Sequence, residues 1–269
     1  MLRWIPDWVI YALVLGVVLW AIFSGGTDDA PPPPPEAIQQ EGAMLPPPPA
    51  FDERVLVQVT APKSGIGTAF AINDCGQWLT ARHVVEGCND VSLLVAPIQY
   101  TPVRSVTISE QYDLALIETA TSPNPAPINT QNDLRIGAYG FHVGYPQGRP
   151  GEAASRLMAR SNLISRGRRS NSESVLAWAE TGRTRGLMGS LGGLSGGPVY
   201  DENGAVRGVI VAESARRGRI YTAAPEAVAE FIKSTGVETL GEQPREFSAA
   251  TYGKEADYAR LNLQVVIVA

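Results

Sequence analysis

Short apolar runs separated by turn residues fill most of the chain after residue 50. The runs are rich in Val, Ile and Leu and are bounded by Gly, Pro, Asn or Asp. This length and composition favour strands over helices, and a spacing of about ten residues is typical of a sandwich or a barrel. The runs are residues 55–60, 67–72, 77–81, 91–96, 113–119, 136–144, 175–180, 197–201, 206–213 and 219–224.

One later segment predicts a helix. Residues 224–236 carry Pro225 where a helix would begin and Gly236 where it would end, which is the usual placement of these two residues. Residues 201–204, Asp-Glu-Asn-Gly, have the composition of a hairpin turn. The strand pattern returns only in residues 259–269. The folded part is therefore predicted to be all-β with one C-terminal helix.

The beginning of the chain has a different character. Residues 8–23 are uninterruptedly apolar and are accompanied by tryptophans of the kind found at membrane interfaces. We predict a transmembrane helix at residues 1–24, with a cleaved signal peptide as the alternative. Arg3 precedes the apolar run and Asp28 follows it, so the positive-inside rule leaves the N-terminus in the cytoplasm.

A proline-rich linker follows the anchor. Residues 25–50 contain the runs PPPPP and PPPP and little that could build a core, which predicts a stiff polyproline II spacer. The expected organisation is an anchor at 1–24, this linker at 25–50, a folded domain at 51–235 and a tail at 236–269. Such a chain would be a single-pass protein of the bacterial inner membrane, with its folded domain in the periplasm.

Composition excludes some classes of partner. The chain has 269 residues, enough for one sizeable domain with attachments, and a net charge of −5. That balance argues against nucleic acid as a partner. Basic residues gather in residues 149–219, and we interpret them as a solvated face rather than a docking patch.

The chain has two cysteines, Cys75 and Cys88. In an exported domain such a pair predicts a disulfide, and two free thiols are the alternative. Two cysteines without a further Cys or a His-x-His pair cannot complete a tetrahedral zinc site. No metal and no cofactor are predicted.

Residues 192–212, GGLSGGPVYDENGAVRGVIVA, place Ser195 among glycines. A serine hydroxyl needs a base to become a nucleophile, and the histidines are His83 and His142. The G-x-S-x-G elbow of α/β-hydrolases requires a later histidine, and none follows. The order Asp113, His142, Ser195 would match subtilisins, whose helix-rich fold disagrees with the strand pattern. The remaining order is His83, Asp113, Ser195.

Three segments carry a family resemblance. GTAFAINDCGQWLTARHVV (67–85), YDLALIE (112–118) and GGLSGGPVYDENGAVRGVI (192–210) resemble the signature regions of trypsin-like serine proteases of the chymotrypsin fold. They most resemble the bacterial HtrA-type branch, and the likeness extends over roughly residues 55–233. It implies two antiparallel six-stranded β-barrels with the active site in the cleft between them.

The resemblance also implies roles for individual residues. The activity would be that of a serine endopeptidase that cleaves a polypeptide through an acyl-enzyme. His83 would be general base and then acid, Asp113 would orient it, and Ser195 would be the nucleophile. The N–H groups of Gly193 and Ser195 would form the oxyanion hole. His142 would be a packing or surface residue on the first strand of the second barrel. The alternative function is a catalytically silent protease-fold scaffold that binds a partner protein at the membrane.

The sequence departs from the family in two places. Leu194 replaces the acid or amide expected before the nucleophile, which argues against activation by N-terminal cleavage and favours a less ordered oxyanion loop. HtrA proteins usually carry a PDZ domain after the protease, and too few residues follow the predicted helix for one. Residues 261–269, LNLQVVIVA, are expected to add as a strand to an exposed edge of their own barrel, with partner binding through this tail as the alternative.

The resemblance also locates the primary substrate pocket. No acid is obviously placed there for Arg or Lys, so we predict a small or aliphatic residue before the scissile bond. Nearby arginines at positions 216, 217 and 219 would favour acidic neighbours. The implied pocket residues are Gly189, Ser190, Leu191, Gly192, Ile210, Val211 and Ala212.

Overall fold

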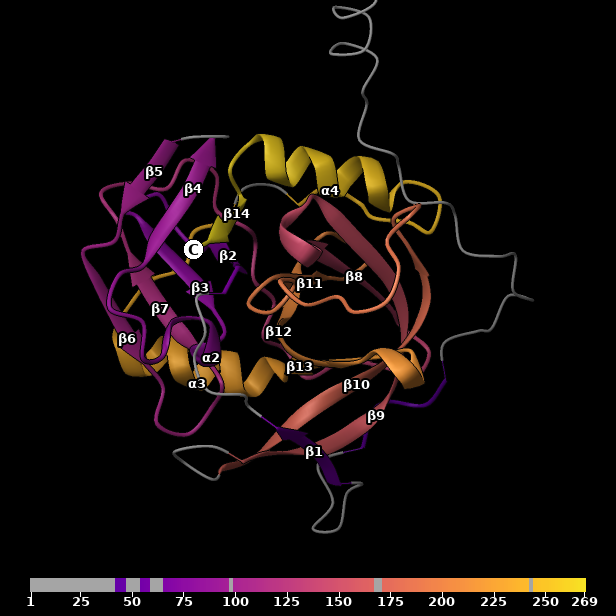
Figure 1. The fold of residues 1–269 in the computed structure, drawn as a ribbon. Helices are drawn as coiled ribbons and strands as arrows, with labels where there is room; N and C mark the ends of the chain where they lie inside the picture. Colours follow the sequence, from indigo (N-terminus) through magenta and orange to yellow (C-terminus); the bar gives the residue numbers. More distant parts are fainter. Residues whose placement is uncertain (1–41, 47–53, 59–64, 97–98, 167–170, 242–243) are drawn as a thin grey trace, which may run out of the picture.

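The computed structural model describes residues 42–46, 54–58, 65–96, 99–166, 171–241 and 244–269 (Figure 1). The fold is mostly β, as predicted, and consists of two sheets with a few helices. The predicted anchor at 1–24 and most of the linker at 25–50 lie outside the described residues. Among the helices that are described, none has the length and apolar character that crossing a bilayer requires.

The later half of the chain forms a closed barrel of six strands. Their order is β9-β10-β13-β12-β11-β8, and pairing of β8 with β9 closes the circle. The prediction of a six-stranded antiparallel barrel is confirmed for this half. The short strand β1 (Arg54–Gln58) pairs in parallel with β9 outside the circle. The barrel strands are β8 (Tyr139–Gly144), β9 (Gly151–Arg166), β10 (Asn171–Arg183), β11 (Pro198–Tyr200), β12 (Val206–Ser214) and β13 (Arg219–Ala223).

The earlier half forms an open, curled sheet, so the prediction of a second closed barrel is wrong. The order is β5-β4-β14-β2-β3-β7-β6. Closure would need a ladder between the end strands β5 and β6, and neither has a second neighbour among the described strands. All four residues of β6 are exposed. The strands are β2 (Gly67–Ala71), β3 (Gln77–Thr80), β4 (Ser92–Ala96), β5 (Gln99–Pro102), β6 (Ser105–Ile108), β7 (Ala115–Glu118) and β14 (Val265–Val268).

The C-terminal residues are part of this sheet. β14 pairs along its length with β2 and, on its other side, with β4. The expectation that the tail docks on its own fold is confirmed, but β14 is inserted between two strands rather than added to an edge. On the β4 side the ladder covers Ile267 and Val268, so the C-terminal end of β14 is paired on both sides.

Two longer helices flank the sheets, α3 (Pro225–Thr235) and α4 (Tyr252–Leu261), drawn at the bottom and the top of Figure 1. The predicted helix is confirmed as α3, with Pro225 in its first turn and Gly236 at φ +71° as its C-cap. The sequence analysis missed α4, because its buried face includes Glu255 and Arg260 and so lacks an apolar stripe. The shorter helical turns are α2 (Arg82–Val85), η1 (Pro146–Gly148) and η2 (Ala215–Arg217).

One core joins the two halves. The largest cluster of buried side chains includes Phe70 and Leu79 from the open sheet together with Phe141 and Val209 from the barrel. Residues 42–46 of the predicted linker also lie on the barrel, where Leu45 is buried and its N–H donates to the Leu134 carbonyl. The folded part therefore includes some residues on both sides of the predicted limits 51 and 235.

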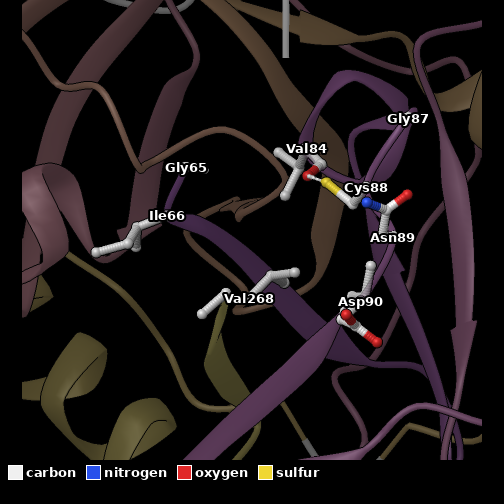
Figure 2. A pocket seen from close by; sticks show the side chains of 10 residues that line it. Gly65, Ile66, Val84, Gly87, Cys88, Asn89, Asp90 and Val268 are labelled. Atoms are coloured by element: carbon white, nitrogen blue, oxygen red, sulfur yellow. Dashed lines mark hydrogen bonds between the residues drawn. The ribbon is translucent and has the colours of Figure 1, made fainter. Parts of the chain in front are cut away.

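The predicted disulfide is wrong, because Cys75 and Cys88 are both free and exposed. Cys75 lies in the turn that follows the C-terminal end of β2. Cys88 lines a cavity of about 550 Å³ together with Gly65 and Ile66, which precede β2 (Figure 2). The five-residue strand between these places spans about 15 Å, whereas bridged cysteines need Cα atoms within about 7 Å of each other.

Both thiols are therefore expected to react with an alkylating agent in folded protein without reductant. The hydrogen bond to Asp74 and the charge of that carboxylate raise the pKa of the Cys75 thiol, so Cys75 should react more slowly at pH 8 than free cysteine does. Intact mass measures the number of labels, with a reduced sample as the control. Labelling that appears only after reduction would show that the two cysteines form a disulfide after all.

Candidate active site

The loop after β3 delivers His83. Strand β3 ends at Thr80, whose hydroxyl donates to the Thr68 carbonyl at 2.7 Å and so fixes the strand end on β2. The short turn α2 follows and carries His83, whose side chain is 26% exposed. The imidazole is thus held at the surface of the open sheet with part of the ring accessible.

Asp113 faces His83 from the segment before β7. One carboxylate oxygen, Oδ1, accepts the backbone N–H of His83 at 2.9 Å, and the other, Oδ2, lies 2.6 Å from Nδ1 of the ring. Since a carboxylate only accepts, Nδ1 carries the proton in this contact. The other ring nitrogen, Nε2, is then free to accept a proton.

Each partner shifts the pKa of the other. Burial lowers the pKa of His83, but the charge of Asp113 and the hydrogen bond to it raise that pKa above its ordinary value overall. Burial raises the pKa of Asp113, but the charge and hydrogen bonds of His83 lower it overall. At neutral pH the structure therefore holds an ionised Asp113 behind an unusually basic imidazole.

Ser195 lies in a turn that touches both halves of the molecule. The Thr68 N–H donates to the Ser195 carbonyl at 2.9 Å, and the Gly196 N–H donates to the Ile210 carbonyl at 2.7 Å. Gly196 has φ +86°, and a Cβ on it would lie 2.1 Å from the Thr68 oxygen and 2.2 Å from the Thr80 hydroxyl. The serine turn therefore packs on β2 and on the end of β3, the strand that leads into the loop of His83.

The turn also presents two backbone donors. Gly193 has φ +99°, and a Cβ there would lie 2.5 Å from the Tyr145 carbonyl oxygen. The Gly193 carbonyl accepts from the Thr68 hydroxyl at 2.7 Å. Within the described residues, the N–H groups of Gly193 and Ser195 donate to no protein acceptor. They are free to bind an oxyanion.

Leu194 anchors this turn by packing. Its side chain is buried in the cluster that also contains Leu191 and Ile210, and its N–H donates to the Leu191 carbonyl at 2.9 Å. The Gln147 N–H, from a backbone with φ 54°, donates to the Gly192 carbonyl. Apolar burial and this contact hold the turn at the position where the resemblance implied an acid or an amide.

The segment of the implied substrate pocket lies against β12. Leu191 donates its N–H to Glu213 at 2.7 Å, and the Ser190 hydroxyl also binds that carboxylate. Gly192 donates to the Ser190 hydroxyl at 2.9 Å, and Gly189 accepts from Arg183 at 2.9 Å. On β12 itself, the residues Ile210, Val211 and Ala212 are buried.

Sequence reasoning missed Glu213. It directly follows the implied pocket wall, and its half-buried carboxylate ties that wall to the opposite segment. An acid therefore stands beside the implied pocket, and it is bound by Ser190 and Leu191. A register shift between Ile210 and Ala212 interrupts the alternation of β12, so residue spacing alone did not indicate this contact.

His142 has a packing role, as predicted. It is completely buried on β8, 2.7 Å from the Ser155 hydroxyl and edge-on to Trp178. Burial lowers its pKa to about 3, so the ring is neutral at physiological pH. Among the described residues, no cluster of His, Cys, Asp and Glu could hold a metal ion.

Comparison with known proteins identifies a family. The sequence matches the family "Trypsin-like peptidase domain" over residues 67–209, more than half of the chain. The chain belongs to the trypsin-like peptidase family. No curated protein matches the sequence.

Solved structures share the fold. The active form of the Rv3671c protease from M. tuberculosis is 18% identical, with a TM-score of 0.53, and the match covers 74% of this chain and 97% of that one. The inactive form of Rv3671c is 22% identical, with a TM-score of 0.51 and coverage of 65% and 89%. The HtrA-type protease AlgW with decapeptide is 17% identical, with a TM-score of 0.48 and coverage of 62% and 50%.

The contact of Gly196 with β2 and β3 gives a prediction. Gly196→Ala should lower the free energy of unfolding by about 2 kcal/mol or more, because the new Cβ meets fixed backbone. Urea unfolding measures the change. Gly186→Ala is the matched control, since Gly186 also has positive φ (+79°) but nothing lies within 4 Å of its Cβ position. Equal losses in the two variants would contradict a close contact at residue 196.

Proposed function

We propose that this chain is a serine endopeptidase in which His83, Asp113 and Ser195 form a catalytic triad. The observation that carries the proposal is the pair of hydrogen bonds that His83 donates to the Asp113 carboxylate, on a loop next to the serine turn. The unpaired N–H groups of Gly193 and Ser195 support it, because they supply an oxyanion hole.

The proposed chemistry is acyl transfer. The Ser195 Oγ forms a bond to the substrate carbonyl carbon while its proton moves to Nε2 of His83. The carbonyl oxygen becomes an oxyanion held by the two N–H groups. His83 returns the proton to the leaving nitrogen as the C–N bond breaks, and a water molecule then releases the acyl group by the same steps.

The proposed substrate is a polypeptide, as membership of a peptidase family suggests. The buried side chains of Leu191 and Ile210 favour a small or aliphatic residue before the scissile bond. The carboxylate of Glu213 already binds Ser190 and Leu191. It is therefore engaged rather than available to a basic side chain.

A catalytically silent scaffold is the second candidate. One observation favours it, since no hydrogen bond joins the His83 ring to the Ser195 hydroxyl in the described part of the chain. Such bonds are often long in free enzymes and tighten with substrate. A protein that never forms the bond would keep the fold and bind a partner at the membrane without turnover.

The proposed location is the bacterial inner membrane, with residues 1–24 as a single-pass anchor and the peptidase domain in the periplasm. The support is the apolar run at residues 8–23 with its charged flanks.

An active-site probe tests the proposed activity. A fluorophosphonate should label the wild-type domain, and Ser195→Ala and His83→Ala should abolish the labelling. Asp113→Asn should slow it by about 10⁴-fold, because the wrong ring tautomer is then favoured. The labelling rate should fall as the pH drops through a value above 6.5, since protonated His83 cannot accept the serine proton and its pKa is raised. Absence of labelling and of peptide turnover, with the fold intact, would favour the scaffold.

Reporter fusions test the proposed location. Alkaline phosphatase fused after residue 50 should be active, and green fluorescent protein at the same point should be dark, because only the former matures in the periplasm. The full-length chain should stay in the membrane after a carbonate wash. A soluble periplasmic protein that lacks the first residues would identify a cleaved signal peptide instead.

A further inference from the structure

A second carboxylate stands behind the Asp113–His83 pair. Glu173 belongs to β10 of the closed barrel, whereas Asp113 precedes β7 and His83 lies on α2, both in the half that forms the open sheet. Glu173 is 8% exposed, and its Oε2 accepts the backbone N–H of Asp113 at 2.7 Å. Burying a carboxylate is unfavourable unless specific partners stabilise it, and the Asp113 N–H is such a partner.

The contact completes a chain of hydrogen bonds. Both carboxylate oxygens of Asp113 point to His83, one to the ring and one to the backbone N–H. The Asp113 N–H points the opposite way, to Glu173. The position of the aspartate is thus fixed from the barrel side by Glu173 and from the sheet side by His83.

The carboxyl group of Glu173 has a pKa close to neutral pH. Burial raises its pKa to about 7, the charge of Asp113 acts in the same direction, and the Asp113 N–H, Arg82 and His83 oppose the rise. The negative charge of Glu173 in turn raises the pKa of His83. Glu173 is therefore coupled to the imidazole without touching it.

The other charged groups around this cluster have partners of their own. On α2, Arg82 donates to the Ser109 carbonyl at 3.0 Å and lies 3.6 Å from Glu86. From the segment before β7, the Tyr112 hydroxyl binds Glu230 of α3 at 2.6 Å.

The remaining acid of that helix is also paired. Glu226 of α3 binds Arg160 of β9. Among the described residues, the charged groups that act on Glu173 are Asp113, Arg82 and His83.

We propose that Glu173 is a positioning residue that holds Asp113 from the opposite half of the molecule and places a second carboxylate behind the Asp113–His83 pair. This inference rests on the proposed peptidase function. During acyl transfer the imidazole becomes a cation, and an ionised Glu173 stabilises it through Asp113. Glu173 contacts neither the substrate nor the reacting atoms, so it acts only through the aspartate.

The direct test is the titration of His83 by NMR. The Ser195→Ala background removes self-cleavage and works whether or not the chain is an active peptidase. The chain has only one other histidine, His142, and burial keeps its pKa at about 3, so one ring signal titrates near neutral pH. Glu173→Gln should move the His83 titration to lower pH by about half a unit, because a nearby negative charge is removed.

The matched control is Glu110→Gln, which removes an exposed carboxylate three residues from Asp113. It should leave the titration within about 0.1 unit, because solvent screens its charge. If the His83 titration curve of Glu173→Gln superimposes on that of the parent, as the control's should, Glu173 does not affect the basicity of His83 and that part of the inference fails.

Probe labelling tests the positioning role. Glu173→Gln keeps an oxygen that accepts the Asp113 N–H, so its labelling rate at the alkaline plateau should fall less than about threefold. Glu173→Ala leaves that N–H without an acceptor, and its labelling rate should fall about tenfold or more. Equal plateau rates in the two variants would overturn the positioning role.

The outcomes separate the two proposals. If the parent chain is never labelled, the peptidase function fails while the NMR titration still decides the coupling. If the parent is labelled and the His83 titration is unmoved, the inference about Glu173 fails alone. Should Glu173→Ala not fold, as thermal melting would show, the titration of the Gln variant still decides whether Glu173 raises the basicity of His83.

Discussion

The contact between the serine turn and the strands β2 and β3 holds the proposed site together. Gly196 lies so close to the Thr68 carbonyl and the Thr80 hydroxyl that no side chain fits between them. Thr80 is also the last residue of the strand that leads to His83. One close contact therefore joins the proposed nucleophile, on the barrel side, to the proposed base, on the side of the open sheet. Every other feature of the site depends on the two halves keeping this distance.

The C-terminal residues also contact the segments that surround the serine turn. Arg260 of α4 is buried and donates to Glu152 at 2.6 Å and to the Gly151 carbonyl at 3.1 Å, at the start of β9. The Tyr145 hydroxyl donates to the Val265 carbonyl at 3.3 Å on β14. Tyr145 also approaches Gly193 through its own carbonyl. The tail thus supports the loop next to the proposed oxyanion donors, and it packs as part of the same fold.

Much of the site could be anticipated from local sequence. The glycines around Ser195 drew attention to this turn, and Gly193 and Gly196 both adopt positive φ there. The scarcity of histidines singled out His83, and the structure brings Asp113 to it. The contributions of Glu173 and Glu213 could not be read in the same way. Each is an ordinary acid in a strand, and its importance comes from a partner 60 or 22 positions away in the sequence.

The sequence by itself determined the strand-rich fold, the helix at Pro225–Thr235 and the order of the three candidate residues, because these depend on local periodicity, end signals and residue type. Only the tertiary structure decided that the first sheet stays open, that β14 is inserted into it and that the two cysteines lie apart. These outcomes depend on which strands pair across long separations. Pairing of that kind is fixed by packing and hydrogen bonding in the assembled fold, and residue spacing does not encode it.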